Sequence, residues 1–306
     1  MEQLTAILVS MVLSATPLLL AATGELVTEK SGVLNLGVEG MMIVGAIIGF
    51  AVTNNSGDHA LGLTCAALAG MAMAALFGYL TLFLLANQVA TGLALTIFGI
   101  GLSALIGKPY NGTPLVRLQQ LDISGVSDIP LIGPLLFSQD ALVYLSVAIA
   151  VLVLLFLNRT RPGLILRSIG ENPDAAHALG YPVRRIRFVA VLFGGAMSGL
   201  GGAYLSVAYT PLWSEGMTAG RGWIALALVV FSTWKPLRLL LGAYLFGFFS
   251  IAQLHAQGFG MRVPPEFLSM LPYLATILVL VIISRDAKRI RLNAPASLGK
   301  AFRATA

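Results

Sequence analysis

Asn35 and Glu39 are the two strongly polar residues of the apolar run 33–53, and they lie four positions apart. This spacing places both on one face of a helix. If the helix begins near Val33 and crosses a membrane, Glu39 lies about 9 Å along it. A carboxylate at that depth costs a few kcal/mol unless it is paired or faces a cavity. Two roles remain open: both residues face a polar path, or Glu39 caps a neighbouring helix end or pairs with a basic group and so braces the fold.

Glycines at 32, 37 and 40 surround this polar pair and predict a broken or closely packed helix. Met41 and Met42 follow, and adaptable thioether side chains suit the lining of a path, although packing towards lipid is their more frequent use. Trp213 belongs by position to an aromatic belt at the membrane surface, or alternatively stacks against a flat solute.

A second candidate site is the polar stretch 167–187, which carries four arginines in a chain that is only 10% charged. Asn172 is a good N-cap, Pro173 suits the first helical position, and Gly180 is a natural left-handed stop. These signals predict a short helix within 172–180. A helix of that length is not stable alone in water. It therefore rests either on its own bundle or against another protein.

Motifs for other chemistry are absent from the sequence. It contains no G-x-x-x-x-G-K-[ST] phosphate loop, no HExxH and no GxSxG. The chain is therefore not expected to hydrolyse ATP or to act as a hydrolase. The single Cys65 excludes an internal disulfide and a cysteine metal site. Ion-coupled secondary transport stays open, with Glu39 as its one strong candidate for binding an ion.

The elements that must position these residues are membrane-spanning helices. The chain of 306 residues is 57% hydrophobic, and several apolar runs reach the roughly 20 residues that a spanning helix needs. We expect an all-α, polytopic transmembrane bundle forming one domain, 1–306, with about nine spans (eight to ten) and some broken or half helices. The apolar runs lie near 3–23, 33–53, 60–86, 88–107, 140–157, 187–208, 222–234, 236–255 and 270–284.

The basic residues predict the orientation. Arginines gather between 158 and 187, and a second basic cluster follows residue 284. The positive-inside rule places both in the cytoplasm, with the N-terminus outside. The formal charge of +6 therefore marks inner loops that lie against membrane lipid, and no nucleic-acid partner is expected. The proline-rich segment 108–139 is expected outside, either as an ordered docking loop or as a plain connector.

Small residues mark the close helix contacts. Gly195 and Gly199 lie four apart on one helix face, a spacing that lets helix backbones approach closely in lipid. They pack either within the subunit or across an interface with a second subunit.

Two motifs carry a family resemblance. "GENPDAAHALGYPVRRIRF" resembles the cytoplasmic signature of permease subunits of ATP-binding-cassette (ABC) importers, in the branched-chain amino acid, simple-sugar and nucleoside family. "GELVTEKSGVLNLGVEGMMIVGA" (24–46) is similar to a second signature, and more specifically to the smaller permease of importers that take nucleosides from a basic-membrane-protein-type lipoprotein. The resemblance covers nearly the whole chain.

The resemblance implies a non-catalytic transport subunit in a bacterial inner membrane. It implies a separate ABC ATPase that binds ATP and Mg²⁺, so this chain itself is expected to carry no cofactor or metal. It also implies a second homologous permease, forming a heterodimer, and a substrate-binding lipoprotein. A nucleoside is the expected solute, with a simple sugar or branched-chain amino acid as the alternative.

The resemblance also makes the short helix a coupling helix that sits in a cleft of the ATPase. The residues that it assigns to this contact are Gly170, Glu171, Asn172, Pro173, Ala175, Ala176 and Gly180. Ala176 is expected to be exposed there, so that a glutamate in its place would leave membrane insertion intact and lose the ATPase. The translocation path is assigned to Asn35, Glu39, Met41, Met42 and Trp213.

Overall fold

The computed structural model describes residues 2–121, 129, 132–258, 267, 270, 274, 277, 281 and 293–303. Over this part of the chain the fold is all-α, and the only β-type pairings are two isolated bridges, Pro114–Leu212 and Gln120–Asp140. The helices are α1 (Glu2–Lys30), α2 (Val38–Ser56), α3 (His59–Gly78), η1 (Tyr79–Phe83), α4 (Gln88–Gly107), η2 (Lys108–Tyr110), α5 (Ile132–Leu136), α6 (Ala141–Arg159), α7 (Arg161–Glu171), α8 (Pro173–Ala178), α9 (Val183–Tyr204), η3 (Leu205–Tyr209), α10 (Arg221–Phe231) and α11 (Pro236–Gly258).

Six helical segments of the described chain are long and apolar enough to cross a membrane: Gln3–Lys30, Val38–Ser56, His59–Phe83, Gln88–Tyr110, Ala141–Arg159 and Val183–Tyr209. They coincide with the first six predicted runs. Two shorter apolar helices, Arg221–Phe231 and Pro236–Ala252, correspond to the seventh and eighth. The ninth run, 270–284, falls almost wholly outside the described residues, so the count of nine stays a prediction.

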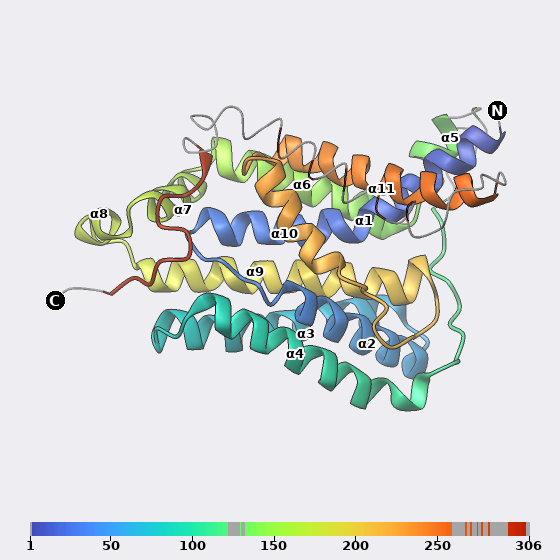
Figure 1. Ribbon diagram of the computed structural model, residues 1–306, viewed down its shortest axis with the longest axis horizontal. Coiled ribbons are helices and arrows are strands. Elements are labelled where there is room, and N and C mark those ends of the chain that lie inside the picture. The colour runs from blue at the N-terminus through green and yellow to red at the C-terminus, as the bar shows by residue number, and fades with distance from the viewer. Residues whose placement is uncertain are drawn as a thin grey trace.

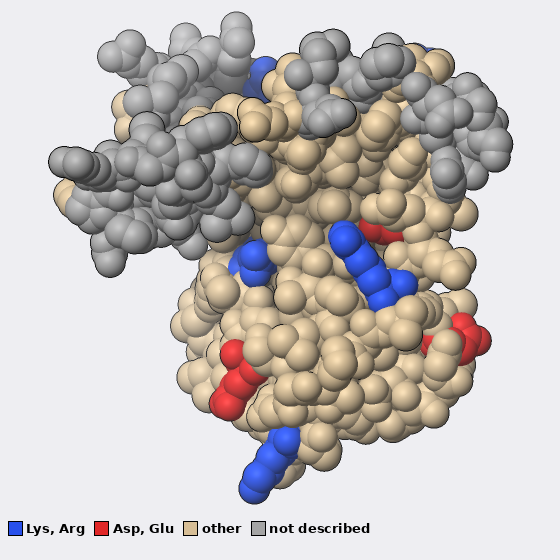
Figure 2. Space-filling model, turned by 90° about the vertical axis from the view of Figure 1, so that its right-hand side faces the viewer, with Lys and Arg blue, Asp and Glu red and all other residues tan. Residues whose placement is uncertain are grey.

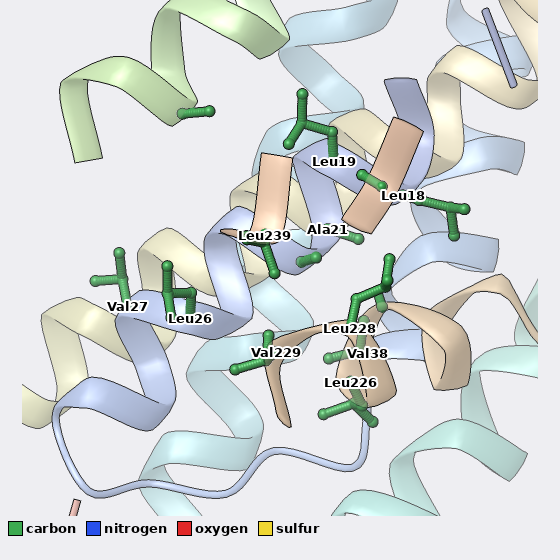
Figure 3. Close-up of a cluster of buried hydrophobic side chains, with 14 of the residues drawn as sticks. Leu18, Leu19, Ala21, Leu26, Val27, Val38, Leu226, Leu228, Val229 and Leu239 are labelled. Atoms are coloured by element: carbon green, nitrogen blue, oxygen red, sulfur yellow. The ribbon is translucent and has the colours of Figure 1, made fainter. Parts of the chain in front are cut away.

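The bundle is built around α1 and α9, which pack against each other along its centre. Figure 1 shows α2, α3 and α4 gathered on one side of this pair, with α6 and α11 on the other and α10 running across α1. The contacts agree, because α9 packs on α2 and α3, whereas α1 packs on α6, α10 and α11. A large apolar cluster lies between α1, α10 and α11 and includes Leu18 and Leu26 of α1, Leu228 of α10 and Leu239 of α11 (Figure 3).

Glycines let α9 approach its neighbours at backbone distance. A methyl group added at Gly199 would overlap the carbonyl oxygen of Ala66 in α3, and one at Gly195 would overlap Ala74. A methyl group at Gly45 in α2 would overlap the backbone of Gly199. Of the two alternatives left open by the sequence, Gly195 and Gly199 therefore pack within the subunit.

The two ends of the bundle differ in charge. One end, called the α8 end below, carries α7, α8 and residues 293–303, and holds the arginines Arg159, Arg161, Arg167, Arg184, Arg185 and Arg187. The opposite end carries the described parts of 108–139 and shows mostly uncharged surface in Figure 2, with scattered lysine, arginine and acidic side chains. This asymmetry follows the positive-inside pattern, with the α8 end corresponding to the predicted cytoplasmic side.

The segment 108–139 is fastened to the bundle at the opposite end. Asp140 caps α6 by accepting hydrogen bonds from the backbone N–H groups of Leu142 and Val143, and it also accepts one from the Tyr204 hydroxyl in α9. Burial raises the pKa of Asp140 above its ordinary value, while these hydrogen bonds oppose the rise. Arg117 donates to the carbonyl oxygen of Ala208 at 2.9 Å. The described part of the segment is therefore held to the bundle by side-chain hydrogen bonds.

Candidate functional site

The short helix α8 begins and ends where its local sequence directs. Asn172 is its N-cap and accepts a hydrogen bond from the backbone N–H of Ala175 at 3.0 Å, and Pro173 opens the helix. Gly180 has φ +86°, a left-handed conformation that glycine adopts without strain, and its N–H donates to the carbonyl of His177. The helix predicted within 172–180 is confirmed as Pro173–Ala178.

One face of α8 is open to solvent. Asp174, Ala175, Ala178 and Leu179 are exposed, and Leu179 is exposed to 78%. An apolar side chain held this far out at a polar, arginine-rich end gains nothing from the bundle beneath it. The exposed face is therefore the part of α8 available to a partner.

Two of the residues assigned to the ATPase contact, Gly170 and Ala176, are buried, which corrects the expectation that Ala176 is exposed. Ala176 is only 3% exposed and packs with Ile169, Val183 and Phe302. Gly170 is also buried, and a side chain there would overlap the carbonyl oxygen of Lys30 at the end of α1. The local caps fix where α8 starts and stops but leave its rotation undetermined, and the rotation turns Ala176 inward. The contact with an ATPase that the resemblance assigns to all seven residues stays a prediction.

The other candidate site, around Asn35 and Glu39, is an interrupted span. The chain leaves α1 at Lys30 and runs without helix through 31–37 toward the middle of the bundle, where α2 begins at Val38 (Figure 1). The predicted break is confirmed, but the helix starts at Val38 and not near Val33. Glu39 therefore lies in the first turn of α2, not 9 Å along a helix.

Side chains satisfy the unwound backbone of 31–37, as a membrane interior requires. The N–H of Leu34 donates to Gln88 Oε1 at 2.8 Å, and the N–H of Asn35 donates to Glu25 Oε1 at 3.2 Å. Asn35 Oδ1 in turn accepts the N–H of Gly37 at 2.9 Å, and Thr96 donates to the carbonyl of Leu36. Asn35 thus braces the stretch from inside.

Glu39 caps the first turn of a different helix, α10. Its Oε1 accepts hydrogen bonds from Thr218 Oγ1 at 2.6 Å and Gly220 N at 2.9 Å, and its Oε2 accepts one from Gly222 N at 2.6 Å. α10 has no side-chain cap of its own, since its N-cap is Gly220. A carboxylate at a helix N-terminus meets unpaired N–H groups and the positive end of the helix dipole. The sequence left two roles open for Glu39, facing a polar path or capping a neighbouring helix end. These contacts favour the second.

The other residues assigned to a path are also buried within the subunit. Met41 and Met42 are in the apolar core, where Asn35 Nδ2 lies 3.5 Å from the Met41 sulfur. Trp213 packs with Ile43, Ile47 and Phe50, and its ring lies so close to Gly107 that a methyl group there would overlap it. Their role in a translocation path stays a prediction, because the described contacts are those of packing.

An apolar cavity of about 630 Å³ opens between α6, α7 and α9, with Val27 of α1 also in its wall. Its walls are hydrocarbon side chains such as Leu152, Phe156 and Val189, and Arg185 is the one charged residue among those that line it. Such a surface suits hydrocarbon and offers a polar solute almost no hydrogen bonds.

The sequence did not reveal two groups of residues that complete these sites. The first is the Thr218–Gly222 turn that binds Glu39. Its signal was present, since the apolar run 222–234 follows Gly220 without a serine, threonine or aspartate immediately before it to cap a helix. The second is the segment 293–303, which packs across the α8 end of the bundle. In the sequence this segment is recognisable only as part of a basic cluster.

A helical membrane bundle with an interrupted span and a capped helix at one end has the construction of a transport subunit. The comparison with known families agrees: the model described as "Branched-chain amino acid transport system / permease component" matches residues 7–280, and the chain belongs to this family.

Its relatives are ABC transporter permeases. The chain is 40% identical to TsgC13 of Haloferax volcanii, a permease provisionally named for glucose, over 94% of both chains. It is 33% identical to the nucleoside permease NupC of Lactococcus lactis, over 90% of this chain and 91% of NupC. It is 32% identical to the guanosine permease NupQ of Bacillus subtilis, over 87% and 88%. No solved structure matches. The chain is thus a non-catalytic permease subunit of an ABC transporter.

Proposed function

We propose that the chain is a permease subunit of an ATP-driven importer for nucleosides in a bacterial inner membrane, and that its ATPase docks on α8. The docking site is proposed from the exposed face of α8, which contains Ala175 and Ala178 and the apolar Leu179 at 78% exposure. ATP and Mg²⁺ would be bound by that ATPase and not by this chain.

Nucleosides are favoured by NupC and NupQ, whose names specify a nucleoside and guanosine. The name of TsgC13 makes glucose the second candidate. Both solutes are neutral and carry a sugar ring. The Glu39 carboxylate of the interrupted span already accepts hydrogen bonds from three donors of its own chain. This arrangement suits a neutral solute.

The proposed assembly contains a second permease and a binding lipoprotein. One chain supplies about half the spans of an importer path, so the path would lie against a homologous partner in a heterodimer. The lipoprotein would deliver solute at the end opposite α8, where the described part of 108–139 is held to the bundle through Arg117 and Asp140.

Uptake into vesicles tests the motor and the solute together. Proteoliposomes with both permeases and the ATPase, given ATP on the ATPase side and the loaded binding protein on the other, should accumulate labelled guanosine. Excess unlabelled glucose should not compete. Accumulation driven by a sodium or proton gradient without ATP would refute the proposal, and competition by glucose would move the solute to a sugar.

Substitution along α8 tests the docking face. Ala175→Glu should leave folding nearly unchanged, since exposed substitutions usually shift stability by under about 0.5 kcal/mol. It should nevertheless lose the ATPase, because a charge pressed into an apolar contact stays unpaired. Co-purification of the ATPase with the permease measures this loss.

The neighbouring residue provides the matched control. Ala176→Glu places the same carboxylate among Ile169, Val183 and Phe302, so it should cost the chain itself several kcal/mol, on the order of 3. Its thermal unfolding in detergent should fall without any ATPase present. Normal ATPase retention and uptake in Ala175→Glu would show that α8 is a surface loop.

A further inference from the structure

The C-terminal residues 293–303, called the strap below, cross the floor of the α8 end. In Figure 1 the strap passes from the region of α7 along the ends of α1 and α9. Ser297 donates to the carbonyl of Gly170 from its N–H at 3.0 Å and from its hydroxyl at 2.6 Å. Lys30 at the end of α1 donates to the carbonyl of Asn293 at 2.7 Å. The strap is thus tied to α1 and α7 at once.

Arg187 joins the strap to the start of the interrupted span. This arginine is fully buried, and its guanidinium donates to Ser31 O at 2.9 Å, to Ser297 Oγ at 2.8 Å and to Lys300 O at 3.3 Å. Gly299 N–H also donates to the carbonyl of Gly32 at 3.2 Å. A buried charge without such acceptors would be strongly unfavourable. Arg187 therefore fixes the strap against residues 31 and 32, where the chain leaves α1.

The far end of the strap supports α8. Phe302 is 6% exposed and packs with Ile169, Ala176 and Val183. Its ring also meets His177 edge to face, with the ring centres 5.6 Å apart. A helix of six residues holds its shape only against a surface. Phe302 is a large part of that surface, because it contacts α8 from the side opposite the exposed face.

We infer that Phe302 and Arg187 are positioning residues that link α8 to the interrupted span through the strap. This inference rests on the proposed function, since it assumes that an ATPase moves α8. A displacement of α8 then reaches Phe302, passes along the strap to Arg187 and Gly299, and acts on residues 31 and 32. Directly after residues 31 and 32 come the rest of the unwound stretch 31–37 and then Glu39, the residue of α2 that caps α10.

The test substitutes Phe302 in the full complex. Phe302→Ala should keep the ATPase bound, since the exposed face of α8 is unchanged, and should lower solute uptake per ATP hydrolysed on the order of tenfold, because the support of α8 is lost. Phe302→Leu retains an apolar side chain and should restore most of the coupling. Arg303→Ala, at the exposed neighbouring position, is the control and should transport normally.

Hydrogen exchange of the permease alone separates this inference from the proposed function. In Phe302→Ala the amides of α8 should exchange faster, while those of α1 and α9 stay protected. Unchanged exchange in α8, or unchanged uptake per ATP, overturns the inference. General loss of protection in α1 and α9 also overturns it, because Phe302 would then hold the whole bundle. If α8 loosens as expected but no ATPase ever contacts it, the proposed function fails and the link between strap and α8 stands.

Discussion

Glu39→Ala should destabilise the folded chain by about 3–5 kcal/mol, because three donors would lose their acceptor inside the bundle. The N–H groups of Gly220 and Gly222 have no other partner within α10, whose first turn precedes any internal hydrogen bond. The space vacated by the carboxylate lies beside Gly222, which approaches the Glu39 backbone closely. Unfolding in detergent, followed by helix content, measures the loss.

One further variant separates charge from shape at this position, and a substitution at a second glutamate serves as the control. Glu39→Gln keeps one acceptor oxygen and turns an N–H₂ group toward the donors, so it should fall between alanine and wild type. Glu215→Ala removes an exposed carboxylate from the same connecting segment, 210–220, and should change stability by under about 0.5 kcal/mol. Stability of Glu39→Ala equal to that of Glu215→Ala would mean that α10 does not depend on this cap.

The elements that the sequence predicted are those whose signals are local. Asn172, Pro173 and Gly180 determine α8 from within a few residues, and the structure forms that helix as expected. The short apolar run at 222–234 became the short helix α10. Gly32 and Gly37 indicated a break, although they did not show that α2 begins as late as Val38.

The features that escaped prediction depend on residues far apart in the chain. Glu39 meets Thr218 and Gly222 across about 180 positions, and the sequence could state that it needs a partner but not which one. Phe302 and Ala176 also lie far apart in the sequence, more than 100 positions, so the exposed and buried faces of α8 could not be distinguished. Hydrophobic character decides that a helix has a buried side, whereas the tertiary neighbours decide which side it is.

Gly195 and Gly199 show the same limit in another form. Their spacing predicted a close contact but not its partner. The structure supplies the partner: α9 crosses α3 and α2 at Ala66, Gly70 and Gly45, with backbone against backbone. The contact lies at the centre of the bundle, since α9 packs on α1, α2 and α3. A side chain inserted there must separate helices that many other contacts hold together.

Gly199→Leu should therefore abolish stable folding, with a loss of about 3 kcal/mol or more. Even its first carbon would overlap the carbonyl oxygen of Ala66, and a backbone atom cannot rotate away as a flexible side chain can. Gly199→Ala should already be destabilising, although alanine favours an isolated helix by about 1 kcal/mol over glycine. The yield of monodisperse protein in detergent and its unfolding midpoint measure both variants.

Gly101 provides the matched control for this contact. It lies in α4, is exposed, and has nothing within 4 Å of the position that a side chain would take. Gly101→Ala should raise stability through helix propensity, by up to about 1 kcal/mol, and Gly101→Leu should be tolerated because no atom of the chain lies where its side chain would begin. The sign of the alanine effect thus differs between two glycines in apolar helices. If Gly199→Ala is as stable as Gly101→Ala, α9 does not pack on α3 at backbone distance, and the central contact of this fold is misplaced.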